Sequence, residues 1–238
     1  MIEFTNASYR YKGEPRLAVD GLSLRALPGR VLALLGPNGS GKSTALGMAA
    51  GWLKPCSGTV SREGRAAFLP QSERLAFSFT CCEYVTFGRA PHLPYLGVPG
   101  GRERELALRA LDSVGMGAFA KKRITALSGG ELQLVRLARA LVQDSAWVIL
   151  DEPTDMLDPA HVAAVGAVVR DMARAGKGVL VSTHDLYFAL ASADDAALIK
   201  AGRLLSHGPT AATLEPGRLS ELYGVTFELR QVPAPVNG

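Results

Sequence analysis

Long apolar runs and an export signal are missing from this sequence of 238 residues, and cysteine is scarce. No apolar run approaches the ~20 residues that a membrane-spanning helix needs, and the first ten residues lack the charged-then-apolar pattern of a signal peptide. The three cysteines are Cys56, Cys81 and Cys82, and no histidine or further cysteine lies near the last two at zinc-site spacing. We therefore expect reduced thiols in a chain kept in the cytosol, unless a partner holds it at a membrane.

Blocks of like charge are also missing. The net charge is +4, and the run KKR at residues 121–123 is short enough to be a solvated turn. The charge pattern therefore gives no indication of a nucleic acid partner. With 47% hydrophobic and 20% charged residues the chain has globular proportions, and its 238 residues suit one domain with a subdomain.

Glycine, by contrast, is concentrated around one lysine in the segment GPNGSGKST, between an apolar run at 30–35 and helical apolar spacing at 45–53. Strand, glycine-rich turn and helix is the setting in which G-x-x-x-x-G-K-[ST] forms a phosphate-binding P-loop, because its backbone N–H groups can surround phosphate oxygens. We expect Lys42 to reach the β- and γ-phosphates of a nucleoside triphosphate and Ser43 to ligate Mg²⁺. The nucleotide-binding residues predicted here are Gly36, Pro37, Asn38, Gly39, Ser40, Gly41, Lys42, Ser43 and Thr44. A P-loop alone leaves kinase, GTPase, helicase and transporter motor open.

Apolar strand patterns alternate with amphipathic helix patterns, which predicts an α/β fold with a largely parallel central sheet. An antiparallel β lobe is expected ahead of the P-loop, and a helical region interrupted by a proline- and glycine-rich loop is expected in the middle of the chain. The predicted segments are strands at 2–9, 17–27, 58–69, 146–150 and 178–183, helices within 72–142 around the loop 88–101, and a hairpin at 197–208.

A second group of motifs lies in the later half of the chain. LSGGE at 127–131 predicts a helix start with Ser128 as N-cap and open N–H groups. Asp151 ends the apolar run WVIL, where an aspartate can hold the Mg²⁺ shell, and Glu152 can polarise an attacking water. His184 follows the next buried strand, where it can contact the γ-phosphate.

The order of P-loop, Gln71, LSGGE, LDE and histidine is specific, and over nearly all of its length the chain resembles the nucleotide-binding subunit of ABC transporters. The resemblance implies a P-loop NTPase core with an antiparallel β lobe and a helical subdomain. It implies that Tyr11 stacks on adenine and that Gln71 joins the Mg²⁺ shell and senses a transmembrane partner. It also implies that Asp151 is the Mg²⁺-associated aspartate, Glu152 the general base and His184 the switch histidine.

The same resemblance implies an assembly. Ser128, Gly129 and Gly130 would close over ATP held by a second copy, so that two chains pack head-to-tail with two ATP molecules between them. After the acids the family often has S-A-L-D, and this chain has TDMLD at 154–158. Leu157 and Asp158 fit that pattern, and Asp158 is included among the nucleotide-binding residues. Asp155 and Met156 replace small residues near the expected dimer seam.

The type of ABC protein is narrowed by what the chain does not contain. It has one cassette, no fused membrane helices and no sustained heptads between Lys42 and Asp151, so an importer ATPase fits best and a soluble non-transport ABC ATPase is the alternative. Residues 85–97, 184–208 and 219–225 resemble ATPases of the iron-siderophore, haem and cobalamin importer family. The segment between Gly58 and Gln71 is shorter than in siderophore-type relatives, which leaves the cargo open.

The importer hypothesis carries expectations about partners and organisation. A permease would hold the chain at the cytoplasmic face of the membrane through residues near 72–98, and a substrate-binding protein would take part only indirectly. Six apolar residues are expected to be divided between the helical core and a permease groove, namely Leu75, Phe77, Phe79, Tyr84, Phe87 and Tyr95. Gly88, Arg89 and His92 are expected in the groove. The expected parts are a core with the β lobe (1–71 and 143–205), a helical subdomain (72–142) and a C-terminal extension (206–238).

Overall fold

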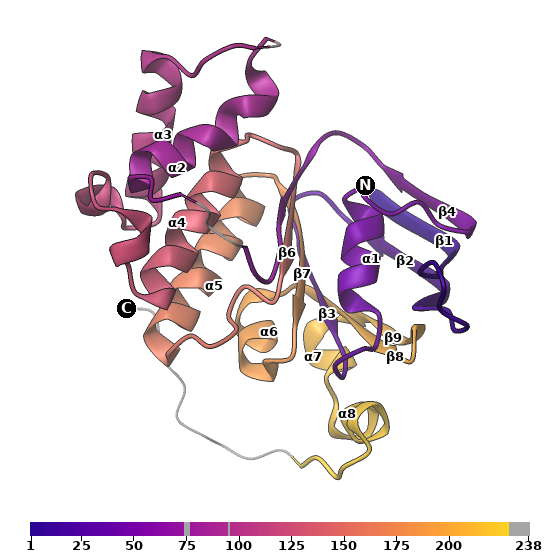
Figure 1. Ribbon diagram of the computed structural model, residues 1–238. Helices are drawn as coiled ribbons and strands as arrows, with labels where there is room; N and C mark the ends of the chain where they lie inside the picture. The colour runs from indigo at the N-terminus through magenta and orange to yellow at the C-terminus, as the bar shows by residue number, and fades with distance from the viewer. Residues whose placement is uncertain (74–76, 95, 229–238) are drawn as a thin grey trace.

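The computed structural model describes residues 1–73, 77–94 and 96–228 and is built around a six-stranded sheet (Figure 1). The strands in spatial order are β5 (Ala66–Leu69), β6 (Trp147–Asp151), β7 (Gly178–Thr183), β3 (Val31–Leu35), β8 (Asp195–Lys200) and β9 (Arg203–Pro209). The first five run parallel, and only β9 pairs antiparallel, with β8. The predicted largely parallel sheet is therefore confirmed, as is the hairpin that turns at Ala201-Gly202.

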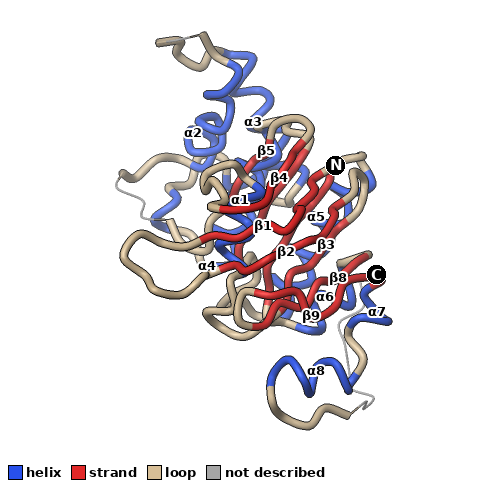
Figure 2. The backbone as a smooth tube through the Cα atoms, turned by 90° about the vertical axis from the view of Figure 1, so that its right-hand side faces the viewer, coloured by secondary structure: helices blue, strands red, loops and turns tan. Residues whose placement is uncertain are grey.

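Each face of this sheet has its own apolar core, because successive side chains of a strand point to opposite faces. Leu32 and Leu34 of β3 pack with α1 (Lys42–Ala49) and with an antiparallel sheet of β2 (Val19–Ala26), β1 (Ile2–Tyr9) and β4 (Ser57–Arg62). Figure 2 shows that antiparallel sheet in face view. Val31, Ala33 and Leu35 of β3 pack on the other side with α5 (Pro159–Arg174) and α6 (Leu186–Ser192).

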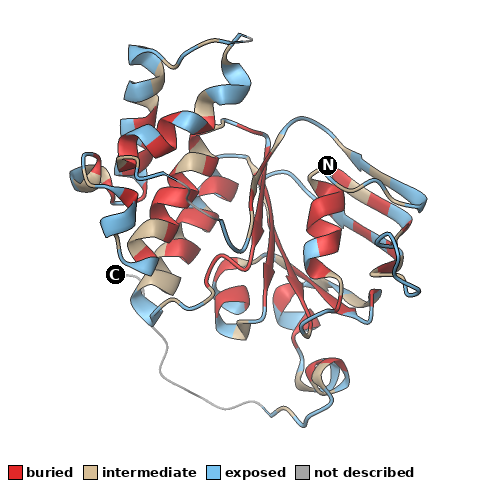
Figure 3. Cartoon of the chain, viewed as in Figure 1, coloured by how far each residue is buried: buried red, intermediate tan, exposed pale blue. Residues whose placement is uncertain are grey.

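The middle of the chain is helical, as predicted. It contains α2 (Cys81–Thr86), α3 (Gly101–Ser113) and α4 (Gly129–Val142), and α2 and α3 extend beyond one end of the sheet (Figure 1). The predicted loop at 88–101 begins instead with a 3-10 helix, η1 (Phe87–His92), and two shorter ones follow α3, η2 (Gly117–Phe119) and η3 (Ile124–Ala126). The inward faces of these helices are buried and their outward faces exposed (Figure 3). No helix among the described residues is long and apolar enough to cross a membrane.

One predicted strand was wrong. Residues 58–69 form two strands in different sheets, because the turn at Gly64, where φ is 82°, separates a mostly exposed β4 from a β5 that pairs with β6. The chain then ends with α7 (Thr210–Thr213) and α8 (Pro216–Tyr223). The C-terminal extension was predicted to begin at residue 206, which lies inside β9. The division of the chain into these parts stays a prediction.

The two tryptophans offer a test of this packing. Trp147 is 2% exposed, its ring lies against Gly178, and its Nε1 donates to the Glu63 carbonyl at 2.9 Å, whereas Trp52 is 65% exposed. We expect Trp147→Ala to lower the free energy of unfolding by about 3–5 kcal/mol through lost burial and a residual cavity. Trp52→Ala is the matched control and should cost less than about 1 kcal/mol. Urea titrations followed by circular dichroism measure both, and equal losses would contradict the assignment of the core.

Candidate nucleotide-binding and hydrolysis site

The P-loop joins the end of β3 to the start of α1. Gly41 is the N-cap of α1 with φ 104°, and a Cβ there would lie 2.4 Å from the Ala18 carbonyl oxygen, so only glycine fits. The Ser40 carbonyl accepts from the Gly202 N–H at 2.9 Å, which ties the loop to the β8–β9 turn. The loop is thus held by neighbouring strands in a shape that presents the N-terminus of α1, where backbone N–H groups favour an anion.

Lys42 is buried at the base of this loop. Its Nζ donates to the carbonyls of Gly36 at 2.8 Å and Pro37 at 3.3 Å, and it lies 3.6 Å from Glu152 Oε1. Both side chains of the Lys42–Glu152 pair are 7% exposed. A buried ammonium beside open backbone N–H groups is suited to bind the phosphates of a nucleotide.

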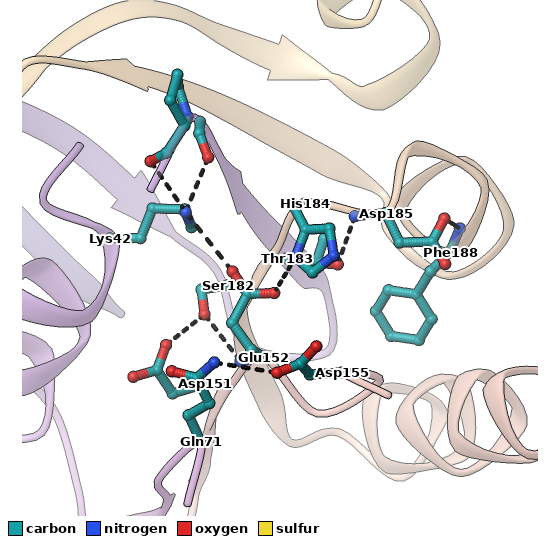
Figure 4. A network of polar contacts seen from close by, with 12 residues as sticks. Lys42, Gln71, Asp151, Glu152, Asp155, Ser182, Thr183, His184, Asp185 and Phe188 are labelled. Carbon is teal, nitrogen blue, oxygen red and sulfur yellow. Dashed lines mark hydrogen bonds and ion pairs between the residues drawn. The ribbon is translucent and has the colours of Figure 1, made fainter. Parts of the chain in front are cut away.

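The two predicted acids stand at the carboxyl end of β6, next to the end of β7. Ser182 Oγ donates to Asp151 Oδ1 at 2.5 Å and accepts from the Glu152 backbone N–H at 3.0 Å (Figure 4). Ser43 Oγ donates to the same Asp151 oxygen at 3.1 Å. Asp151 therefore connects the start of α1 with the ends of β6 and β7.

Glu152 is positioned by its backbone and by His184. Its φ is 47°, an uncommon conformation for a residue other than glycine, and its carboxylate is buried. His184 Nδ1 lies 3.0 Å from Glu152 Oε2 (Figure 4). The His184 side chain is 58% exposed. A shielded carboxylate with a partly exposed imidazole beside it is a geometry suited to proton transfer from water.

A cavity of about 410 Å³ gathers most of the predicted nucleotide contacts. Its lining comprises Tyr11, Ala18, Asn38, Gly39, Ser40, Gly41, Lys42, Ser43, Thr44, Gln71 and Glu152. The Tyr11 hydroxyl lies 3.1 Å from Thr44 Oγ1, and its ring meets Tyr9 edge-on at a centroid distance of 5.0 Å. Tyr11 is 44% exposed, so part of its ring is open at the edge of the cavity.

Gln71 is held by the residue that departs from the family pattern. Gln71 Nε2 donates to Asp155 Oδ2 at 3.2 Å, so the side chain that lines the cavity is also tied to the segment after the acids (Figure 4). Met156, the second departure, is 97% exposed. Asp155 thus has a partner within its own chain, which the sequence did not indicate.

The LSGGE residues do not line this cavity. Ser128 caps α4 as predicted, accepting from the Glu131 N–H at 3.2 Å, and the Glu131 carboxylate accepts from the Ser128 N–H in return. The hydrogen bond from the Ser128 backbone lowers the pKa of Glu131. A Cβ at Gly130 would lie 2.3 Å from the ring of His161, so a larger residue there would displace that ring.

Asp158 belongs to this second group of residues. It caps α5 by accepting from the His161 N–H at 3.0 Å, and its other oxygen lies 2.7 Å from His161 Nδ1. These contacts with the His161 backbone and ring lower the pKa of Asp158. Through His161, Asp158 is therefore joined to Gly130 and not to the cavity of its own chain.

The donor set at the start of α1 fits a magnesium ion. Mg²⁺ prefers oxygen ligands and is commonly held by one or two carboxylates together with substrate phosphates. The Ser43 hydroxyl and the Asp151 carboxylate, 3.1 Å apart, are oxygen donors at the edge of the phosphate-binding loop. Among the described ranges there is no group of three or more His, Cys, Asp or Glu side chains that could hold a metal.

Two residues that contact the predicted site residues were missed by the sequence analysis. Ser182 bridges Asp151 and Glu152, and its signal was a polar residue inside the otherwise apolar strand GVLVST. His161 packs on Gly130 and binds Asp158, and its position three residues after an N-cap aspartate was the only signal for it.

Comparison with known proteins agrees with this geometry. A family model described as ABC transporter matches residues 19–155. Hemin import ATP-binding protein HmuV of Gloeobacter violaceus is 40% identical over 230 residues, covering 88% of this chain and 83% of the relative. HmuV of Pseudomonas aeruginosa is 37% identical over 255 residues, covering 98% of this chain and 96% of the relative.

Solved structures give the same result. A structure described as an inward-facing conformation of a metal-chelate type ABC transporter superposes with a TM-score of 0.88 at 29% identity, covering 94% of this chain and 89% of that chain. The dimeric structure of MJ0796, a bacterial ABC transporter cassette, has a TM-score of 0.78 at 26% identity, covering 88% and 99%. The fold and the site define a P-loop ATPase that binds and hydrolyses ATP. The chain belongs to the ABC transporter family, and the fold class predicted from its motifs is confirmed.

Ser182 provides a test of the site. Removing its hydroxyl in Ser182→Ala leaves the Asp151 carboxylate and the Glu152 N–H without a shared partner. A hydrogen bond to a charged group contributes ~1.5–3 kcal/mol, so we expect kcat for ATP hydrolysis to fall by about tenfold or more. Ser192→Ala is the matched control, because Ser192 is also buried and its hydroxyl donates to the Phe188 carbonyl away from the cavity. Steady-state phosphate release measures both, and an unchanged kcat in Ser182→Ala would remove Ser182 from the site.

Proposed function

We propose that this protein is the ATP-hydrolysing subunit of an importer that takes up haem or a related iron complex through a separate permease. The observation that carries the proposal is the near full-length similarity to hemin import ATP-binding proteins, 98% of this chain and 96% of one relative. The structural neighbour of metal-chelate type supports the same cargo class. The cargo itself would contact the permease and a binding protein, not this chain.

In the proposed reaction, Lys42 and the loop N–H groups bind the β- and γ-phosphates. Ser43 and Asp151 would hold Mg²⁺, with Gln71 completing its shell, and the ion supplies charge neutralisation on the phosphates when it is bound. Glu152 would take a proton from the water whose oxygen attacks the γ-phosphorus, while the bond from that phosphorus to the ADP oxygen breaks. His184, 3.0 Å from the Glu152 carboxylate, would keep it oriented and contact the γ-phosphate.

A second copy of the chain would complete the site. Ser128 and Gly129 sit at the N-terminus of a 14-residue helix, yet neither lines the cavity that holds the P-loop of the same chain. Such a helix end favours an anion, and the dimeric cassette among the structural neighbours supports a two-chain arrangement. In this proposal each ATP lies between the P-loop of one chain and Ser128 of the other.

Glu152→Gln tests hydrolysis and assembly together. The amide is nearly isosteric but cannot accept the proton, so we expect turnover to fall by ~10²–10⁴ while ATP still binds. With ATP and Mg²⁺ this variant should form a two-fold dimer, and with ADP it should remain monomeric. Light scattering measures the mass under each nucleotide. Parental hydrolysis would reject Glu152 as the base, and one mass under both nucleotides would count against the dimer.

The helical part of the chain offers a surface for a permease. A cavity of about 710 Å³ lies between α2 and α3. Phe79, Phe87, Val98 and Leu108 give it a mostly apolar lining, and the charged residues of the lining are Glu83, Arg104 and Lys121. Phe79 and Phe87 meet edge-on at a centroid distance of 4.8 Å. We propose that a short cytoplasmic helix of the permease docks here through apolar contact.

The other residues predicted for this groove lie elsewhere. Tyr84 is buried in the core, and Gly88 is buried against Arg139 and Val142 of α4. Arg89 donates to the Val142 carbonyl at 2.9 Å, and His92 Nε2 lies 2.6 Å from the Gln143 carbonyl oxygen. Arg89 and His92 thus meet the carbonyls at the C-terminus of α4, as positively polarised groups commonly do. Phe77 is 69% exposed outside the cavity lining. Leu75 and Tyr95 lie outside the described residues.

Co-purification tests the permease. Expressed with its genomic neighbours, the chain should purify with a polytopic membrane protein. Phe87→Glu or Val98→Glu should abolish that association, because each replaces an apolar contact of the cavity with a carboxylate. Val225→Glu, at an exposed site on the C-terminal segment, is the control. ATP binding by the isolated chain should be unchanged in all three. Purification without a membrane protein, together with no effect of the cavity variants, would favour a soluble ABC ATPase.

A further inference from the structure

Arg136, on α4, holds the backbone on both sides of the Pro70-Gln71 peptide. Its Nη2 donates to the Pro70 carbonyl at 2.5 Å, and its Nη1 donates to the Gln71 carbonyl at 3.5 Å and to Gln133 Oε1 at 2.8 Å. The Arg136 side chain is only 9% exposed. One guanidinium therefore binds the main chain of the glutamine loop to the helix that begins with the LSGGE motif.

Burying this guanidinium is costly. Desolvation lowers the pKa of Arg136, and its Nε is buried without a hydrogen bond, 3.8 Å from Glu73 Oε2. An apolar side chain would pack in such a place without that cost. The guanidinium is nevertheless retained here, where it contacts the backbone of the glutamine loop through Nη1 and Nη2.

Glu73 anchors the same loop one turn further along α4. Arg139 donates to both of its oxygens, at 2.7 and 2.8 Å, and the Tyr84 hydroxyl donates to it at 2.7 Å. Despite partial burial, which opposes the effect, these hydrogen bonds and the nearby guanidinium charges lower the pKa of Glu73, so its carboxylate stays ionised. Arg139 also lies 4.4 Å over the Tyr84 ring. The segment from Pro70 to Glu73 is thus held to α4 at two successive turns.

We propose that Arg136 is a positioning residue that couples Gln71 to the LSGGE loop of the same chain. Gln71 lines the nucleotide cavity, and Ser128 lies at the start of the helix that carries Arg136, roughly 12 Å away at 1.5 Å per residue. Because a helix of this length moves as a rigid body, a shift of the glutamine loop on ATP binding would reposition the serine offered to the partner's ATP. This inference rests on the proposed function. It assigns to one side chain the link between Gln71 in the chain's own cavity and the serine offered to the partner's ATP.

The test measures movement of the helical subdomain separately from ATP binding. In a Glu152→Gln, Cys56→Ser background, spin labels at Ser61→Cys on β4 and Ser113→Cys on α3 report the distance between core and helical subdomain by pulsed EPR. Both serines are exposed, and the remaining cysteines are buried. Labelled chains are diluted with unlabelled ones so that only distances within a chain are read.

Arg136→Met should bind ATP with parental affinity, because Arg136 does not line the nucleotide cavity, and should lose the ATP-induced change in distance. Arg136→Lys retains the charge, but its single nitrogen cannot reproduce the planar fork whose Nη1 and Nη2 reach two different carbonyls. It should lose at least half of the change in distance, which provides the test if Arg136→Met fails to fold. Arg170→Met is the matched control: Arg170 donates to the Ala191 carbonyl at 2.6 Å from α5, and its loss should leave the change intact. If either Arg136 variant kept the full ATP-induced change in distance, the coupling would be overturned and the proposed function would stand. No change in the parent would overturn both the ATP-driven closure and the coupling.

Discussion

Three adjacent strands of the parallel sheet end at one level, and each delivers one part of the nucleotide site. The register pairs Leu35 with Thr183 across β3 and β7, and Asp151 with Ser182 across β6 and β7. The P-loop, the two acids and His184 therefore leave the sheet side by side, although they are far apart in sequence. Parallel strands buried on both faces allow little slippage of register, so the distances between these groups are set by the sheet and not by the loops.

This arrangement places two opposite charges in the interior. Lys42 and Glu152 are each 7% exposed and 3.6 Å apart, and Lys42 also donates to two loop carbonyls. Buried charges of this kind are stable only while each has a partner. A triphosphate that takes Lys42 as its partner leaves Glu152 to His184 and to water.

Sequence patterns predicted the parts of the site whose geometry is local. The P-loop follows from glycine spacing between strand and helix, and the Ser128 cap follows from its position before α4 and Glu131 three residues later. The Gln71–Asp155 and Ser182–Asp151 contacts depend on segments that meet only in the folded chain, so no local pattern encodes them. The split of β4 from β5 was missed for a related reason, because both halves are extended and only their partner strands differ.

The predicted site residues form two groups, those that line the nucleotide cavity and those around the LSGGE loop, and the packing at the start of α4 separates them. The ring of His161 occupies the space beside Gly130 and bonds to Asp158, so the LSGGE loop and the start of α5 form one packed unit outside the nucleotide cavity. In the proposed dimer, that unit would contact the ATP of the other chain. The same helix is attached to the loop of Gln71 through Arg136. A single helix therefore carries the contact proposed for the partner's ATP and is bonded to the loop that lines the chain's own cavity.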